Sequence, residues 1–249
     1  MINIKFNKCL IAVTLLFAFI SCKTSVEELK SPTLNDYFPL QTGKYITYQL
    51  DSLVYINFGT RDTTISYQVK YVTDSLIFAD ANQKTFRVLR YIRKSSNQSW
   101  SPDAAYLAVN TGSSIQFTEN NLKFIKLQMP VSNDFSWKGN AYIETTSADS
   151  PVRYLDNWNY TYSGVGVTEM LSNNENAETI TVNQRDETVG YVDNPDSYSE
   201  INFAQEKYAK GIGMVYRKFF HKEYQPGSGN GGYVAEGSYG VTYTMIDHN

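Results

Sequence analysis

The stretch ISYQVKY, residues 65–71, decides the fold. Its apolar and polar residues alternate one by one. Successive side chains of an extended chain point to opposite faces, so this spacing places every apolar residue of the stretch on one face. A helix would need apolar residues three and four positions apart. The stretch therefore predicts a β-strand with one buried face, formed by Ile65, Tyr67, Val69 and Tyr71.

The same alternation recurs along most of the chain, with turn-forming Asn, Asp, Gly and Pro between the segments. Residues 201–209 also fit a short helix, but a strand is the preferred interpretation. Roughly ten short strands predict an all-β protein: a single antiparallel domain that forms a curved sheet, half-barrel or barrel, with a β-sandwich as the alternative. The other alternating segments are 46–50, 84–93, 122–129, 158–168, 178–185, 212–223 and 233–246.

The N-terminus has the features of an export signal. Lys5 and Lys8 precede an uncharged apolar run, LIAVTLLFAFI, at residues 10–20. As a helix this run spans roughly 16 Å, against about 30 Å for the hydrocarbon core of a bilayer, so it predicts a cleaved signal and not a membrane span. Residues 19–22, FISC, resemble a bacterial lipobox. The resemblance implies that Cys22 is acylated and anchors the mature protein in a membrane.

The chain is therefore divided into three parts. Residues 1–21 are predicted to be a lipoprotein signal peptide, residues 22–35 the acylated cysteine and a flexible tether, and residues 36–249 a single β domain. The tether is polar and contains no aromatic residue. Loss of two lysines with the signal changes the formal net charge from −3 to −5. A charge so close to balance excludes a generic nucleic-acid binder.

Four groups of motifs spread over the chain carry a family resemblance. They are YFPL with GKY at 37–45, LQMPV with WKGN at 127–140, YAKGIGMVY at 208–216 and MIDHN at 245–249. Together they resemble uncharacterised small β-rich lipoproteins of Bacteroidota, although Ile46 stands where many relatives have Trp. The resemblance implies a β fold and a lipid anchor at the outer membrane, on its periplasmic face or at the cell surface. It implies no reaction, because the family has no established activity.

Signals for catalysis and cofactors are weak. The two histidines are too few for a histidine-based metal site, and no catalytic residue, metal site or cofactor is predicted. His221 and Glu223 lie two residues apart on one face of a predicted strand, where they can meet as a general acid–base pair. A solvated polar face is the favoured interpretation of this pair. The glycine-rich residues 227–232 lack the Gly-Lys-Ser/Thr ending of a phosphate-binding loop.

Aromatic residues make up 14% of the chain and are the one compositional hint of binding. Trp158, Tyr160 and Tyr162 alternate on one predicted strand face, where such rings stack on sugars or line an apolar cavity. Core packing is the favoured interpretation, so no ligand-binding residue is predicted. A basic strand has charges that split across both faces and is interpreted as solvated; its residues are Lys84, Arg87, Arg90, Arg93 and Lys94.

These observations lead to one functional expectation and one alternative. We expect a membrane-anchored envelope lipoprotein without an evident catalytic site, which serves as a binding or assembly module for a glycan, lipid or protein. The lipid on Cys22 is expected to anchor the protein in the membrane, and no nucleic acid is expected as a partner. The alternative is a glycan-directed hydrolase whose active site cannot be recognised in the sequence.

Overall fold

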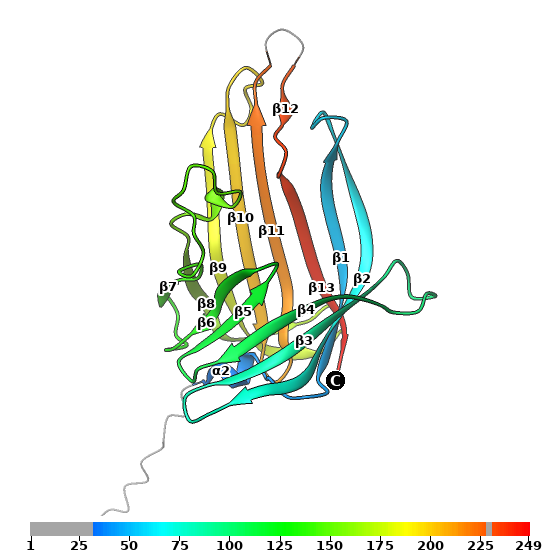
Figure 1. Cartoon of the computed structure of the whole chain (residues 1–249), viewed down its shortest axis with the longest axis vertical. Helices are drawn as coiled ribbons and strands as arrows, with labels where there is room; N and C mark the ends of the chain where they lie inside the picture. Colours follow the sequence, from blue (N-terminus) through cyan, green and yellow to red (C-terminus); the bar gives the residue numbers. More distant parts are fainter. Residues whose placement is uncertain (1–31, 228–230) are drawn as a thin grey trace, which may run out of the picture. The chain divides into compact units, whose positions relative to one another are not determined.

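The computed structural model describes residues 32–227 and 231–249, and its regular structure is almost entirely antiparallel strand (Figure 1). All strands belong to one sheet, which confirms the predicted all-β, single antiparallel domain in place of the alternative sandwich. Within these described residues, two short helical pieces accompany the sheet, α2 (Leu34–Tyr37) and η1 (Arg153–Leu155). The strands are β1 (Tyr45–Ile56), β2 (Arg61–Ala79), β3 (Lys84–Arg93), β4 (Ser101–Asn110), β5 (Ser114–Glu119), β6 (Leu122–Gln128), β7 (Ser136–Lys138), β8 (Asn159–Met170), β9 (Asn176–Gly190), β10 (Ser199–Ala209), β11 (Gly213–Gln225), β12 (Tyr233–Val234) and β13 (Tyr239–His248).

The sheet curls into a nearly closed barrel. Its strand order is β6-β5-β4-β3-β2-β1-β13-β11-β10-β9-β8-β7, and β12 pairs with β11. The edge strands β6 and β7 do not pair as strands, but they approach each other: Ile125 N donates to Gly139 O at 2.6 Å, and Trp137 Nε1 donates to Ile125 O at 2.8 Å. The barrel wall therefore has one unsealed seam, between β6 and β7.

The alternating segments predicted from the sequence correspond to strands of the sheet. Residues 65–71 lie in β2, where Val69 is buried opposite Tyr48 of β1. Ile65 of the same face is 37% exposed, so the expected buried face is wrong for this residue. Residues 201–209 lie in β10, as preferred over a helix. The predicted strand 233–246 is instead two strands, β12 and β13. Gly237 lies between them with φ at +93°, a left-handed conformation that favours glycine and turns the chain.

Aromatic side chains fill much of the barrel interior. Trp158, Tyr160 and Tyr162 are buried in one core cluster, and Leu34 and Tyr37 of α2 join it from one end of the barrel (Figure 1). Leu34 falls within the segment predicted as tether. The packed domain therefore begins a few residues before the expected boundary at residue 36.

The predicted signal peptide 1–21, the acylation site Cys22 and residues 23–31 lie outside the described residues. Their assignments stay predictions. Within residues 32–227 and 231–249, neither helical piece has the length and apolar character that crossing a bilayer requires.

Candidate functional site

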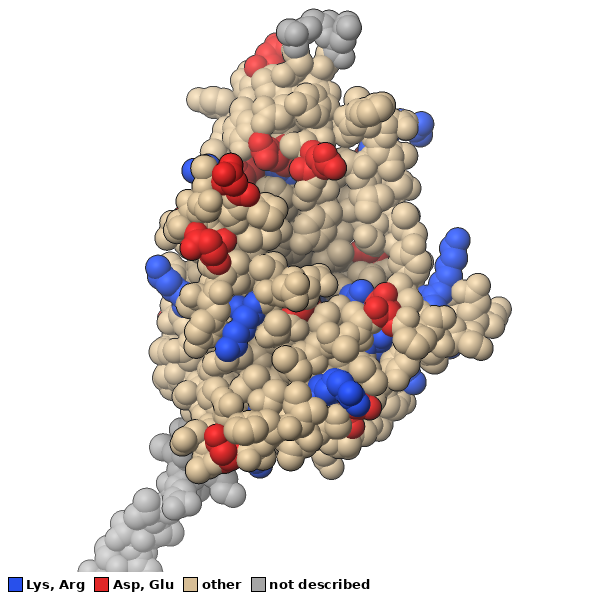
Figure 2. Space-filling model, viewed as in Figure 1, with Lys and Arg blue, Asp and Glu red and all other residues tan. Residues whose placement is uncertain are grey.

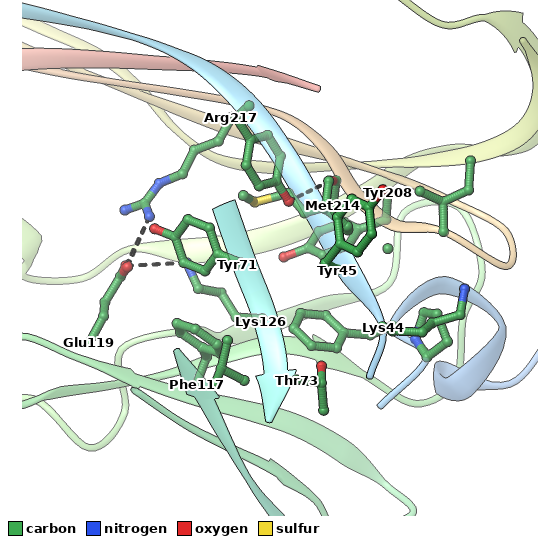
Figure 3. Close-up of a pocket in the computed structure, with 17 residues that line it drawn as sticks. Lys44, Tyr45, Tyr71, Thr73, Phe117, Glu119, Lys126, Tyr208, Met214 and Arg217 are labelled. Atoms are coloured by element: carbon green, nitrogen blue, oxygen red, sulfur yellow. Dashed lines mark hydrogen bonds and ion pairs between the residues drawn. The ribbon is translucent and has the colours of Figure 1, made fainter. Parts of the chain in front are cut away.

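Four charged side chains meet inside the barrel, and we call them the ion cluster: Glu119 at the end of β5, Lys126 in β6, Glu206 in β10 and Arg217 in β11. Lys126 Nζ lies 2.6 Å from Glu206 Oε1 and 3.7 Å from Glu119 Oε1. Arg217 Nη1 lies 2.9 Å from Glu119 Oε1 (Figure 3). The cluster therefore ties β5 and β6, at one edge of the sheet, to β10 and β11 in its other half.

Two members of the ion cluster, Glu119 and Arg217, stabilise each other's charged forms. Burial alone would raise the pKa of Glu119, but Arg217 and Lys126 outweigh it and keep that pKa below its ordinary value. Burial would lower the pKa of Arg217, whereas Glu119 and Glu206 raise it well above the usual range. Tyr208 donates its hydroxyl to Glu206 Oε2 at 2.6 Å, and burial raises the pKa of that hydroxyl. Glu119 and Arg217 therefore stay ionised inside the barrel.

The ion cluster contributes to the walls of two cavities. The small cavity, of about 80 Å³, is largely apolar and is lined in part by Tyr71 and Phe117 (Figure 3). The large cavity has a volume of about 280 Å³. Glu119, Lys126 and Arg217 line both cavities. The space-filling view is visibly hollowed near the centre of the face drawn (Figure 2).

The large cavity combines aromatic walls with a few polar groups, which is the usual composition of a small-molecule site. Its volume is near the lower end of the range of about 300–1,000 Å³ for such sites. Arg90 of β3 lines it, forms an ion pair with Asp103, and lies 5.6 Å from the centre of the Tyr106 ring. The aromatic lining includes Tyr106, Tyr154, Trp158, Tyr160, Phe219 and Tyr239.

Gln184 of β9 is a polar group that the fold leaves without a partner. It is 5% exposed and lines the large cavity, and no atom of the described residues accepts a hydrogen bond from its Nε2. It lies in a β-bulge, because Asn183 pairs with Gln205 while Arg185 pairs with the adjacent Ala204. A bulge redirects the side chain that it contains. A buried donor without a partner costs about 1–3 kcal/mol, so an acceptor on a ligand would satisfy this amide favourably.

We expect Gln184→Met to raise the free energy of unfolding of the ligand-free protein by about 1 kcal/mol, because methionine is similar in size and buries no donor. Urea denaturation of the wild type and the variant measures the change. The matched control, Gln41→Met at an exposed position, is expected to change stability by less than about 0.5 kcal/mol. A clear loss of stability in Gln184→Met would mean that the fold itself already satisfies the amide.

The structure does not bring His221 and Glu223 together as an acid–base pair. His221 Nδ1 lies 2.7 Å from Asn202 Oδ1 of the neighbouring strand, and the imidazole stacks on the Tyr154 ring at 4.0 Å between centres. Glu223 instead accepts a hydrogen bond from Gln225 Nε2 at 2.6 Å. His221 is buried, so the favoured solvated interpretation is also wrong for this residue. His221 therefore has its partner on the neighbouring strand, and Glu223 has its partner farther along its own strand.

The buried His221 predicts a loss of stability in weak acid. Burial lowers its pKa, and the nearby Glu200 and Glu223 oppose this only in part. The unfolded chain, with a histidine pKa of about 6.5, therefore takes up the proton first as the pH falls. We expect the free energy of unfolding to decrease between about pH 7 and pH 5.5, and to decrease less in His221→Gln. Denaturation curves at both pH values test this; equal decreases in the two proteins would refute it.

The structure tests the interpretations of the aromatic residues at 158–162 and of the basic strand at 84–94. Trp158, Tyr160 and Tyr162 are buried, so core packing is confirmed and these rings form no exposed binding row. Trp158 and Tyr160 also line the large cavity. In β3, Arg87 pairs with Asp74 at the surface, as a solvated residue does. Arg90 faces the large cavity, so the solvated interpretation is wrong for this residue.

Gln184 and the ion cluster were not recognised in the sequence, although Gln184 carried a signal. It lies in the predicted strand 178–185, in step with Ile180 and Val182, which are fully buried. A polar residue on the core-facing side of a strand marks a group that needs a partner in the interior. The ion cluster had no such local signal, because its members come from four different strands.

Comparison with known proteins leaves the family open. No family model matches this sequence, and no curated protein matches it. Among solved structures, the chain is similar to a Bacteroides fragilis protein that is provisionally described as exported and has a YmcC-like fold. The two are 8% identical, the match covers 86% of this chain and 98% of that one, and the TM-score is 0.39. A TM-score this low does not establish a shared fold.

Proposed function

We propose that this chain is an exported lipoprotein, anchored at the outer membrane through Cys22, that binds a small ligand in the large cavity of its barrel. The observation that carries the binding is Gln184, which lines that cavity and whose buried Nε2 has no partner among the described residues. A ligand that brings an acceptor would satisfy this amide. The surrounding aromatic rings supply apolar contact area.

The polar groups around the large cavity favour binding over hydrolysis. Hydrolysis of a glycoside commonly needs two carboxyl groups that flank the bond, one of them protonated. In the described part of the chain, the lining of the large cavity contains one carboxylate, Glu119, and no histidine. Arg217 and Lys126 hold the pKa of Glu119 below its ordinary value, which disfavours the proton-donating form. The hydrolase alternative therefore has less support than the binding function.

The binding function is tested with a chemically diverse library of small molecules and ligand-detected NMR on the full chain. We expect compounds that bind the wild type and Gln41→Met and are lost or weakened in Gln184→Met. This pattern places them in the large cavity, because the two substitutions are chemically identical and differ only in position. A library with no compound that distinguishes Gln184→Met from the other two proteins would refute the proposal.

Anchoring is tested separately, by metabolic labelling with palmitate. We expect label on the wild-type chain and none on Cys22→Ala, because removal of Cys9 with the signal leaves Cys22 as the single thiol of the mature chain. Two or more acyl chains are needed for a stable anchor, so Cys22→Ala should also leave the membrane fraction. Label that persists in Cys22→Ala would show that the anchor is elsewhere.

A further inference from the structure

The charges around the large cavity indicate which class of ligand it takes, an inference that rests on the proposed binding function. Among the described residues, three cations and one carboxylate, Glu119, line the cavity, and each of these cations has a carboxylate partner, so the ion pairs are neutral. A carboxylate or phosphate on a ligand would bring an unbalanced negative charge beside Glu119, which is costly in a buried site. The pairs are Arg90 with Asp103, Lys126 with Glu206, and Arg217 with Glu119.

An alkyl chain is also a poor match for this cavity. It offers no acceptor to the Nε2 of Gln184, which would remain without a partner. It would also remove water from the guanidinium of Arg217 and the carboxylate of Glu119 without replacing the lost hydrogen bonds. The polar groups of the cavity therefore disfavour a lipid tail.

A neutral ring that bears hydroxyl groups meets these requirements together. A hydroxyl both donates and accepts, so it can accept from Gln184 and donate to Glu119. Tyr239, which lines the cavity and is 36% exposed, offers apolar contact to the face of such a ring. A cavity of about 280 Å³ limits the ligand to a small one. We infer that the large cavity binds an uncharged sugar, either free or as the terminal unit of a glycan.

Isothermal titration calorimetry tests the inference on the full chain, extracted in a zwitterionic detergent that has no sugar headgroup. The probes are glucose, galactose and N-acetylglucosamine, with glucuronate as the charged analogue and octanoate as the alkyl probe. We expect at least one neutral sugar to bind, glucuronate to bind less well than glucose, and octanoate not to bind. Gln184→Met should weaken sugar binding about tenfold, and Gln41→Met should not change it. Methyl glycosides and disaccharides distinguish a free sugar from the terminal unit of a glycan. A cavity that binds a terminal unit tolerates a substituent at the anomeric carbon, whereas a cavity for the free sugar does not.

The outcomes separate this inference from the function on which it rests. Binding of octanoate without any neutral sugar would overturn the sugar assignment and leave the binding function in place. Tighter binding of glucuronate than of glucose would overturn the argument from charge, and with it the assignment. Equal sugar affinity in the wild type and Gln184→Met would place the sugar outside the large cavity. If no probe binds and the small-molecule library also yields no ligand, both the assignment and the binding function are refuted.

Discussion

Lys126→Met is expected to lower the free energy of unfolding by about 3–5 kcal/mol, the cost of removing one partner from a buried ion pair. Methionine keeps an apolar stem but lacks the ammonium group, which lies 2.6 Å from Glu206 Oε1. Glu206 is 0% exposed, so its carboxylate would stay buried, with Arg217 Nε 3.6 Å away as the remaining cation. Urea denaturation followed by circular dichroism measures the loss.

Two controls separate this effect from the loss of any lysine. Lys207, in β10, pairs with Glu169 where both side chains are partly exposed, and Lys207→Met is expected to cost no more than about 1 kcal/mol. The double variant Lys126→Met with Glu206→Gln is expected to recover most of the loss, because no unpaired charge stays buried. If Lys126→Met costs no more than Lys207→Met, the ion cluster does not tie the two halves of the sheet together.

Trp158→Ala is expected to cost a similar amount, about 3–5 kcal/mol, because it removes a large buried side chain and leaves a cavity. Trp158 is 2% exposed, and its Nε1 donates to Tyr154 O at 2.7 Å. The substitution therefore removes both packing and a hydrogen bond that holds η1 against the barrel. Thermal and urea denaturation of the variant measure the loss.

The matched control is an aromatic residue at the surface. Tyr191 is 74% exposed, and Tyr191→Ala is expected to change the free energy of unfolding by less than about 0.5 kcal/mol. Trp158→Phe keeps a ring but loses the donor. Its loss in free energy of unfolding should lie between those of Trp158→Ala and Tyr191→Ala. A nearly unchanged stability in Trp158→Ala would contradict the buried position of this ring.

Local pattern predicted the strands well but predicted side-chain partners poorly. Residues 65–71 and 201–209 are strands, because alternation depends only on neighbours in sequence. His221 shows the opposite case. Its partner is Asn202 on the adjacent strand, and Glu223 of its own strand pairs elsewhere. Strand register, which brings His221 opposite Asn202, is a property of two strands together and is not written in either one.

The alternating residues alone predict an all-β domain, because side chains two residues apart share a face in any extended strand. Which polar groups meet depends on how distant strands come together in the folded chain. Lys126 and Glu206 are 80 residues apart in the chain, and Arg217 and Glu119 are 98 apart. An alternating pattern shows which side chains share a face. Whether that face encloses a cavity depends on the order of the strands and on how far the sheet curls, which contacts between distant residues determine.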